Sequence, residues 1–318
     1  MASPTPKSRP QPLKPSKRPP AQPQPSSHSP EVVDPVWLIK AIGATLVAAL
    51  LCGYLTLCLL FYQGQWQLIL HPTRSTPAPA NIGGAAFTTI HFGVDETAAP
   101  QLTGWWIPAE PGGRYAADTI LYLPSGDGAL ADAAPRLAAL HSLGINLFAF
   151  DYRGYGQSAP TRPNQRRMTG DATSAWKYLT VSRALSPSHI VLFGDGVGCA
   201  LAAELAAAHP DAPAVILQSP RPDLLQVVLA DPRTRSLPVR SLFHDRFEIT
   251  GPASSLKTPK LFLIPASPAG SGDQPASDIQ GLTATAATPK MISTLHTADW
   301  NGPIYREPIV RFLDQYVR

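Results

Sequence analysis

Three glycines at alternate positions, Gly194, Gly196 and Gly198, separate an apolar stretch from an alanine-rich one. The apolar residues Ile190–Phe193 predict a buried strand, and Val197–Ala208 predicts a helix. Glycines in such a turn permit a positive φ and let the helix pack closely on the strand. A dinucleotide-binding turn has the spacing G-x-G-x-x-G after the first strand of a sheet, whereas this turn has no glycine at that spacing and follows a late strand. We therefore expect a tight strand–turn–helix unit.

Short apolar stretches alternate with helical patterns over most of the chain, and this alternation predicts βαβ units around a mostly parallel sheet with helices on both faces. The segment 221–258 interrupts the alternation and is interpreted as a small lid. The Gly-, Ser- and Pro-rich segment 265–284 predicts a long loop. Strands are expected at 87–92, 102–107, 119–123, 145–150, 190–193, 214–217, 261–265 and 291–294, and helices at 129–142, 171–179, 197–208 and 305–316.

The most specific motif of the chain is the block Asp151–Gly156, which reads D-Y-R-G-Y-G and is followed by Ser158. This block resembles the D-Y-R-G-Y-G-x-S motif of α/β hydrolases, and more closely their membrane-anchored branch of depalmitoylase- and lysophospholipase-like serine hydrolases. The resemblance covers about residues 70–318. It implies an α/β-hydrolase fold in which the glycine turn is the nucleophile elbow, G-x-S-x-G, with Gly194 and Gly198 as its flanking glycines.

Several family motifs are degenerate in this chain. The resemblance places the nucleophilic serine at Gly196, and it places the catalytic acid at Pro268, so that Asp273 is the nearest substitute. It places the base at His296, in the sequence His296-Thr297-Ala298-Asp299-Trp300. Where relatives have an H-G-N oxyanion loop, the chain reads Pro124-Ser125-Gly126, and the pocket is expected at Ser125, Gly126 and Val197.

Serine hydrolysis needs a nucleophile, a base that takes its proton and a group that orients the base. With glycine at the nucleophile position, we expect a pseudoenzyme that retains His296 as a vestigial base and binds a ligand or a partner. The alternative is an active esterase or acyl hydrolase that uses Asp195, Ser125 or a water activated by His296. In that case His296→Ala would abolish turnover. A third interpretation, a membrane protein without a pocket, predicts no ligand-induced change in thermal stability.

The sequence disfavours both Asp195 and Cys199 as nucleophiles. An elbow centred on Asp195 would place Phe193 and Val197 at positions that need small side chains. Cys199 falls inside the predicted helix and is interpreted as a small core residue.

The run Ala41–Tyr62 contains no charged residue and reaches ~33 Å as a helix, enough to cross a bilayer core of about 30 Å. We predict a Pro-rich disordered tail at 1–35, a transmembrane helix at 36–62 and a hydrolase-like domain at 63–318. Basic residues precede the run, so the tail is expected in the cytoplasm and the domain outside it. The alternative is a cleaved signal peptide, although the end of the run has no small-residue cleavage site.

The formal net charge is +4, and much of the excess lies in the N-terminal tail, so nucleic-acid binding is not predicted. Cys52 and Cys58 lie inside the apolar run, which leaves Cys199 without a disulfide partner in the soluble part. No metal or other cofactor is expected. The predicted partners are the lipid bilayer, through residues 36–62, and an acyl or lipid ligand or a membrane protein. The composition favours a bacterial inner membrane, with the domain in the periplasm or otherwise outside the cytoplasm.

Overall fold

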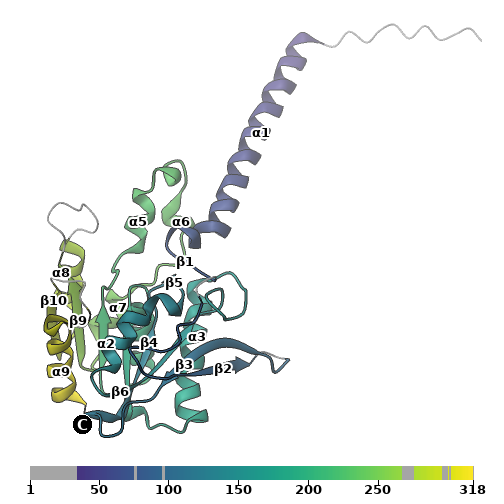
Figure 1. Ribbon diagram of the computed structural model, residues 1–318. Coiled ribbons are helices and arrows are strands. Elements are labelled where there is room, and N and C mark those ends of the chain that lie inside the picture. Colours follow the sequence, from purple (N-terminus) through teal and green to yellow (C-terminus); the bar gives the residue numbers. More distant parts are fainter. Residues whose placement is uncertain are drawn as a thin grey trace, which may run out of the picture. The chain divides into compact units, whose positions relative to one another are not determined.

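The computed structural model describes residues 34–74, 77–94, 97–266, 276–295, 300 and 302–317 (Figure 1). Nearly all of the predicted tail at 1–35 lies outside these residues, as do Pro268, Asp273 and His296. The chain forms two compact units, Met1–Tyr54 and Leu55–Arg318, and the second contains the whole sheet.

The first element is helix α1, Pro35–Gly64. The stretch Pro35–Leu68 has a mean hydropathy of 2.3 over its most apolar window and is long enough to cross a membrane. An N-terminal apolar helix is therefore confirmed at the predicted place. A signal sequence would share these properties, so membrane anchoring and its direction stay predictions.

The main sheet is mostly parallel and has the strand order β10-β9-β8-β7-β4-β6-β3-β2. β3 runs antiparallel to both of its neighbours, β2 and β6, and the other pairs of this sheet are parallel. A second small sheet pairs β1 with β5 in parallel. The predicted α/β-hydrolase fold is thus confirmed. The strands are β1 His71–Pro72, β2 Thr88–Val94, β3 Pro100–Ile107, β4 Tyr115–Leu123, β5 Asp127–Gly128, β6 Ile145–Asp151, β7 Ile190–Asp195, β8 Val215–Gln218, β9 Lys260–Pro265 and β10 Lys290–Leu295.

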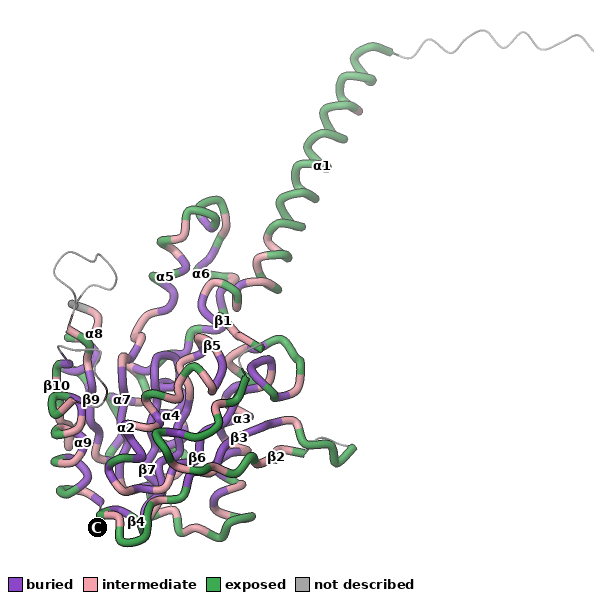
Figure 2. The backbone as a smooth tube through the Cα atoms, viewed as in Figure 1, coloured by how far each residue is buried: buried purple, intermediate pink, exposed green. Residues whose placement is uncertain are grey.

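Helices cover both faces of the sheet, and the side chains of each strand alternate between them. Leu121 and Leu123 of β4 join one core with the helices α3, Gln165–Lys177, and α4, Gly198–Ala208. Ile120 and Tyr122 join the other core with α2, Ala134–His141, and α9, Pro303–Tyr316. Buried residues therefore concentrate in the strands and on the inner sides of the helices (Figure 2).

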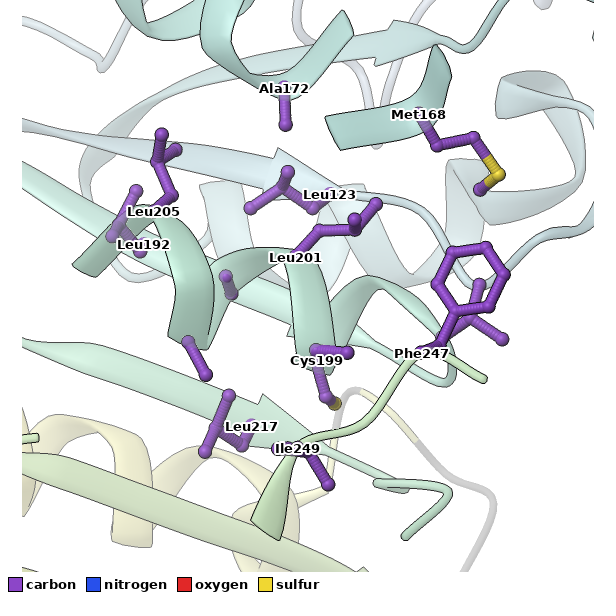
Figure 3. Packing of buried hydrophobic residues seen from close by; sticks show 14 of the residues in the cluster. Leu123, Met168, Ala172, Leu192, Cys199, Leu201, Leu205, Leu217, Phe247 and Ile249 are labelled. Carbon is purple, nitrogen blue, oxygen red and sulfur yellow. The ribbon is translucent and has the colours of Figure 1, made fainter. Parts of the chain in front are cut away.

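The segment predicted as a lid contains three short helices, α5 Leu224–Ala230, α6 Val239–Leu242 and α7 Thr250–Ser255. The hairpin of α5 and α6 extends away from the sheet (Figure 1). Farther along, Phe247 and Ile249 are buried beside α4 and Cys199 (Figure 3). The second half of the segment therefore belongs to the core.

One local prediction was wrong over its described residues, and another was right only in part. The loop expected at 265–284 includes a helix, α8 Ala276–Thr285, because Leu282 is buried in the core and this burial outweighs a weak helix propensity. The helix expected at 129–142 is confirmed as α2 over Ala134–His141, but it begins later than predicted. A 3-10 turn, Leu130–Ala133, precedes it, and α2 has a proline in its first turn.

Candidate functional site

The candidate site lies where the strand order changes direction. β4 has β6 on one side and β7 on the other, so the connections that leave β4 and β7 diverge to opposite faces of the sheet. Ligands of open α/β sheets bind outside the carboxyl ends of the strands at such a point. Leu123 of β4 pairs in register with Gly194 of β7, and this pairing brings Ser125 close to Gly196.

The flanking glycines of the elbow allow α4 to lie directly on β4. A Cβ atom at Gly198 would overlap the carbonyl oxygen of Leu123 and lie 2.7 Å from that of Pro124. A Cβ atom at Gly194 would lie 2.6 Å from the Cα of Cys199. Both positions require glycine because backbone atoms occupy the space of a side chain.

Gly196 keeps the backbone conformation of a nucleophile elbow without carrying a nucleophile. Its φ is +54°, in the left-handed region that glycine adopts without strain. A Cβ atom here would lie 3.0 Å from both the Cβ and the carbonyl oxygen of Ser125. The turn therefore has the geometry of an elbow, but Ser125 packs against the place where a nucleophilic side chain would begin.

Replacing Gly196 with alanine is expected to lower the free energy of unfolding by about 1–3 kcal/mol, because the left-handed backbone and the contact with Ser125 both oppose a side chain. The expected result is a lower midpoint of urea denaturation for the detergent-solubilised full chain. Combining Ser125→Gly with Gly196→Ala should recover the part of the lost free energy of unfolding that the contact with Ser125 causes. Gly112→Ala, where φ is +80° and no atom lies within 4 Å of the added Cβ, serves as the control for backbone strain alone. Equal losses at the two glycines would contradict a contact with Ser125.

The backbone group that would stabilise an oxyanion already has a partner. In serine hydrolases with this elbow, the N–H of the residue after the nucleophile donates to the oxyanion. Here the N–H of Val197 donates to the carbonyl oxygen of Ser125 over 3.3 Å. The Ser125 hydroxyl accepts from the backbone N–H of Asp127 over 3.3 Å, within its own turn.

The D-Y-R-G-Y-G block supports this loop. The hydroxyl of Tyr152 donates to the carbonyl oxygen of Pro124 over 3.2 Å, and that of Tyr155 donates to Gly126 over 2.9 Å. The carboxylate of Asp151 accepts from the N–H of Leu130 over 2.7 Å. These contacts fix residues 124–130 beside the elbow, so the block has a structural role.

Burial raises the pKa of Asp151 to about 6, even though the N–H groups of Leu130 and Gln157 stabilise its charged form. A carboxyl whose folded pKa exceeds its unfolded value holds its proton more tightly in the folded protein. Asp151 should therefore make stability fall as pH rises from about 4 to about 6, by up to about 3 kcal/mol. We expect Asp151→Asn to flatten this part of the curve of unfolding free energy against pH. An unchanged slope in the variant would contradict the assignment.

Asp195 cannot serve as a nucleophile at the elbow, which corrects one of the alternatives drawn from the sequence. By strand alternation its side chain points with Val191 and Phe193 into the core beneath α2 and α9. It is buried, forms an ion pair with Arg136 of α2 and accepts from the hydroxyl of Tyr122 over 3.3 Å. Burial raises the pKa of Asp195, and Arg136 opposes this effect.

Further buried polar groups adjoin this pair. The hydroxyl of Tyr305 donates to the side-chain oxygen of Gln218 over 2.8 Å, and the guanidinium of Arg136 lies 4.7 Å from the ring centre of Trp300.

Cys199 is buried on the other side of the elbow, where burial raises the pKa of its thiol well above the usual range. That position disfavours a reactive thiolate.

A polar cluster that the sequence did not indicate lies next to the oxyanion loop. Asp127 accepts from Nδ1 of His71 over 2.7 Å with one carboxylate oxygen, and from the guanidinium of Arg221 over 2.7 Å with the other. His71 and Asp127 face each other because β1 pairs with β5 in register. No local motif marks these residues, since their proximity depends on the pairing of distant segments.

The residues that follow Arg221 in the chain help to line an open groove. Its volume is about 500 Å³, and its wall includes Pro222 and Leu225 of the lid and Leu282 of α8. Charged side chains of Arg246 and Glu248 also line it. The groove is thus amphipathic.

The described residues do not cover every predicted site position. Ser125, Gly126, Gly194, Gly196, Val197 and Gly198 come together at the elbow. The predicted base and acid, His296 and Asp273, lie outside the described residues, and their roles stay predictions. Among the residues that the structure describes, no group of His, Cys, Asp and Glu is arranged to hold a metal ion.

Comparisons with known proteins place this arrangement in a family. A protein from Mycobacterium tuberculosis strain H37Rv, "Uncharacterized protein Rv2307c", is 29% identical over 87% of this chain and 97% of its own. The mouse "Alpha/beta hydrolase domain-containing protein 17C" is 28% identical over 48% of this chain and 44% of its own. Among solved structures, the Pyrococcus furiosus esterase Pf2001 superposes with a TM-score of 0.60 over 79% of this chain and 99% of its own, at 16% identity, which shows a shared fold.

The family model described as "Serine aminopeptidase, S33" matches residues 128–293, which is more than half of the chain. The matched region contains the elbow, the D-Y-R-G-Y-G block and the lid segment. The chain belongs to this hydrolase family within the α/β-hydrolase superfamily.

Proposed function

We propose that the protein is a membrane-anchored, non-catalytic member of the α/β-hydrolase family that binds an acyl or lipid ligand, or a membrane protein, at the site around the elbow. This proposal rests on the absence of a nucleophilic side chain and of a free oxyanion donor at the elbow. Gly196 supplies no nucleophilic atom, and the N–H of Val197 donates to the carbonyl of Ser125. Covalent acyl transfer requires both of these groups.

The anchoring part of the proposal rests on α1 and on the charge asymmetry around it. It places the N-terminus in the cytoplasm and the domain in the periplasm or outside, at a bacterial inner membrane. A reporter fused after Arg318 that is active only outside the cytoplasm would support this topology, and one active only in the cytoplasm would overturn it.

The test of catalytic inactivity is covalent labelling of the detergent-solubilised full chain with a fluorophosphonate probe, beside a serine esterase of known activity. We expect no label on the native protein. The Gly196→Ser variant should also stay unlabelled, because Ser125 crowds the new side chain and its carbonyl occupies the N–H of Val197. Label on the native protein would overturn the proposal.

One observation favours a second candidate, an acyl hydrolase with a displaced nucleophile. Ser125 lies against the position where the side chain of a nucleophile at 196 would begin. This hypothesis predicts label on the native protein that disappears in Ser125→Ala, together with ester hydrolysis lost in the same variant. Asp127→Ala is unsuitable as a control because Asp127 contacts Ser125, whereas Ser188→Ala changes a distant, exposed serine.

A further inference from the structure

We propose that His71, Asp127 and Arg221 form a binding site for the phosphate group of a membrane amphiphile. This inference rests on the proposed function as a non-catalytic ligand-binding protein and names the chemical class of its ligand.

The three side chains come from distant parts of the chain and meet at one carboxylate. His71 begins β1, Asp127 begins β5, and Arg221 follows β8. Asp127 pairs with each of the two side chains over 2.7 Å, and the side chains of His71 and Arg221 remain 61% and 33% exposed. This exposure leaves the imidazole and the guanidinium accessible to a ligand.

The carboxylate uses only part of the hydrogen-bonding capacity of its neighbours. Asp127 engages Nδ1 of His71 and one terminal nitrogen of Arg221. Within the described part of the chain, the second ring nitrogen and the other guanidinium N–H groups have no partner. A phosphate has acceptor oxygens on several sides and, when singly ionised, a hydroxyl that donates. It can therefore accept from the planar fork of Arg221 and hydrogen-bond the second ring nitrogen of His71 at once. Asp127 then holds the two groups in position.

The cluster is joined directly to the oxyanion loop, which packs against the elbow. The backbone N–H of His71 donates to the carbonyl of Gly126 over 2.9 Å. The space above Gly126 is closed by Val197, whose Cγ2 would lie 2.7 Å from an added Cβ. A phosphate at His71 and Arg221 would therefore lie beside the loop of the degenerate catalytic site. Pro222, the residue after Arg221, lines the groove, and we assign that groove to a chain attached to the phosphate.

The source of the ligand is inferred from the path of the chain after the apolar helix. His71 follows Tyr62, the last residue of the apolar run, by only nine positions, which span at most ~32 Å when extended. The intervening segment is packed rather than extended, because Gln65 is buried and donates to the carbonyl of Leu242 over 3.2 Å. Leu70 is buried next to Gly126. The site therefore lies less than ~32 Å from the point where the predicted membrane helix ends.

The experiment uses the full chain in a non-ionic maltoside detergent and measures the midpoint of thermal unfolding during titration with three probes. Decyl phosphate carries both the headgroup and an alkyl chain, inorganic phosphate carries the headgroup alone, and decanol carries the chain alone. The variants are Arg221→Gln and His71→Gln. Arg233→Gln is the matched control, since Arg233 pairs with Asp231 over 2.6 Å in an exposed position.

We expect decyl phosphate to raise the midpoint saturably, with an apparent affinity at least tenfold above that of inorganic phosphate. Arg221→Gln and His71→Gln should each weaken the affinity for decyl phosphate at least tenfold. Arg233→Gln should leave this affinity unchanged. Equal affinity for decyl phosphate and decanol, or an unchanged affinity in both site variants, would overturn the phosphate site. An equal affinity for decyl phosphate and inorganic phosphate would overturn the proposal that the ligand is an amphiphile. Fluorophosphonate labelling reads the proposed inactivity separately, so a failure of one proposal is distinguishable from a failure of the other.

Discussion

Replacing Gly198 with alanine is expected to destabilise the protein by about 3–5 kcal/mol, a large effect for one methyl group. The added Cβ would meet the carbonyl oxygens of Leu123 and Pro124. Neither oxygen can move aside as a side chain could, because Leu123 is paired within the sheet and the carbonyl of Pro124 accepts from Tyr152. Helix α4 would have to shift away from β4, and buried contacts between the helix and the sheet would be lost.

The measurement is urea denaturation of the full chain in detergent, followed by tryptophan fluorescence. Gly281→Ala is the matched control, because Gly281 lies inside helix α8 with no atom within 4 Å of the added Cβ. Alanine in that helix should stabilise the protein by roughly 0.5–1 kcal/mol. A similar result at Gly198 would show that the close helix–strand contact does not require glycine.

Replacing Arg136 with leucine is expected to lower the free energy of unfolding by about 3–5 kcal/mol near pH 8, because it leaves the buried carboxylate of Asp195 without its cation. Without Arg136 the folded pKa of Asp195 should rise further above its unfolded value. Stability then falls as pH rises from the unfolded pKa through the folded one, so the loss should be smaller in acid. The curve of unfolding free energy against pH, for native and variant proteins, checks both statements.

Two companion variants separate this effect from general damage to the core. Asp195→Asn in the Arg136→Leu background should recover part of the loss, because an amide does not need a cation. Arg233→Leu removes an exposed ion pair with Asp231 and should change stability little. If the loss were independent of pH and of Asp195, it would reflect lost packing of the arginine side chain against Trp300 instead.

The sequence was sufficient to predict the fold, because apolar stretches and turn residues record the order of strands and helices. The elbow was equally accessible, since Gly194 and Gly198 follow a strand and precede a helix. The helix α8 was missed because its sequence is rich in small and polar residues and it is stabilised by burial of Leu282.

The sequence alone did not indicate which side chains from distant segments contact each other. Arg136 and Asp195 meet because α2 covers the face into which alternate residues of β7 point. His71 meets Asp127 because two short strands pair in register. The contact of Ser125 with Gly196 depends on ångström-scale positions at two strand ends. None of these relations leaves a pattern in a single sequence.

The hydrogen bond from Val197 to Ser125 also bears on the evolutionary history of the site. A codon change that placed serine at position 196 would put its Cβ against Ser125, whose carbonyl oxygen already accepts from the N–H of Val197. Such a serine would gain no hydrolytic activity until the loop around Ser125 also changed its position. If the protein is non-catalytic, as we propose, the missing nucleophile and the occupied oxyanion donor reinforce each other, because reversing either one alone would restore no activity.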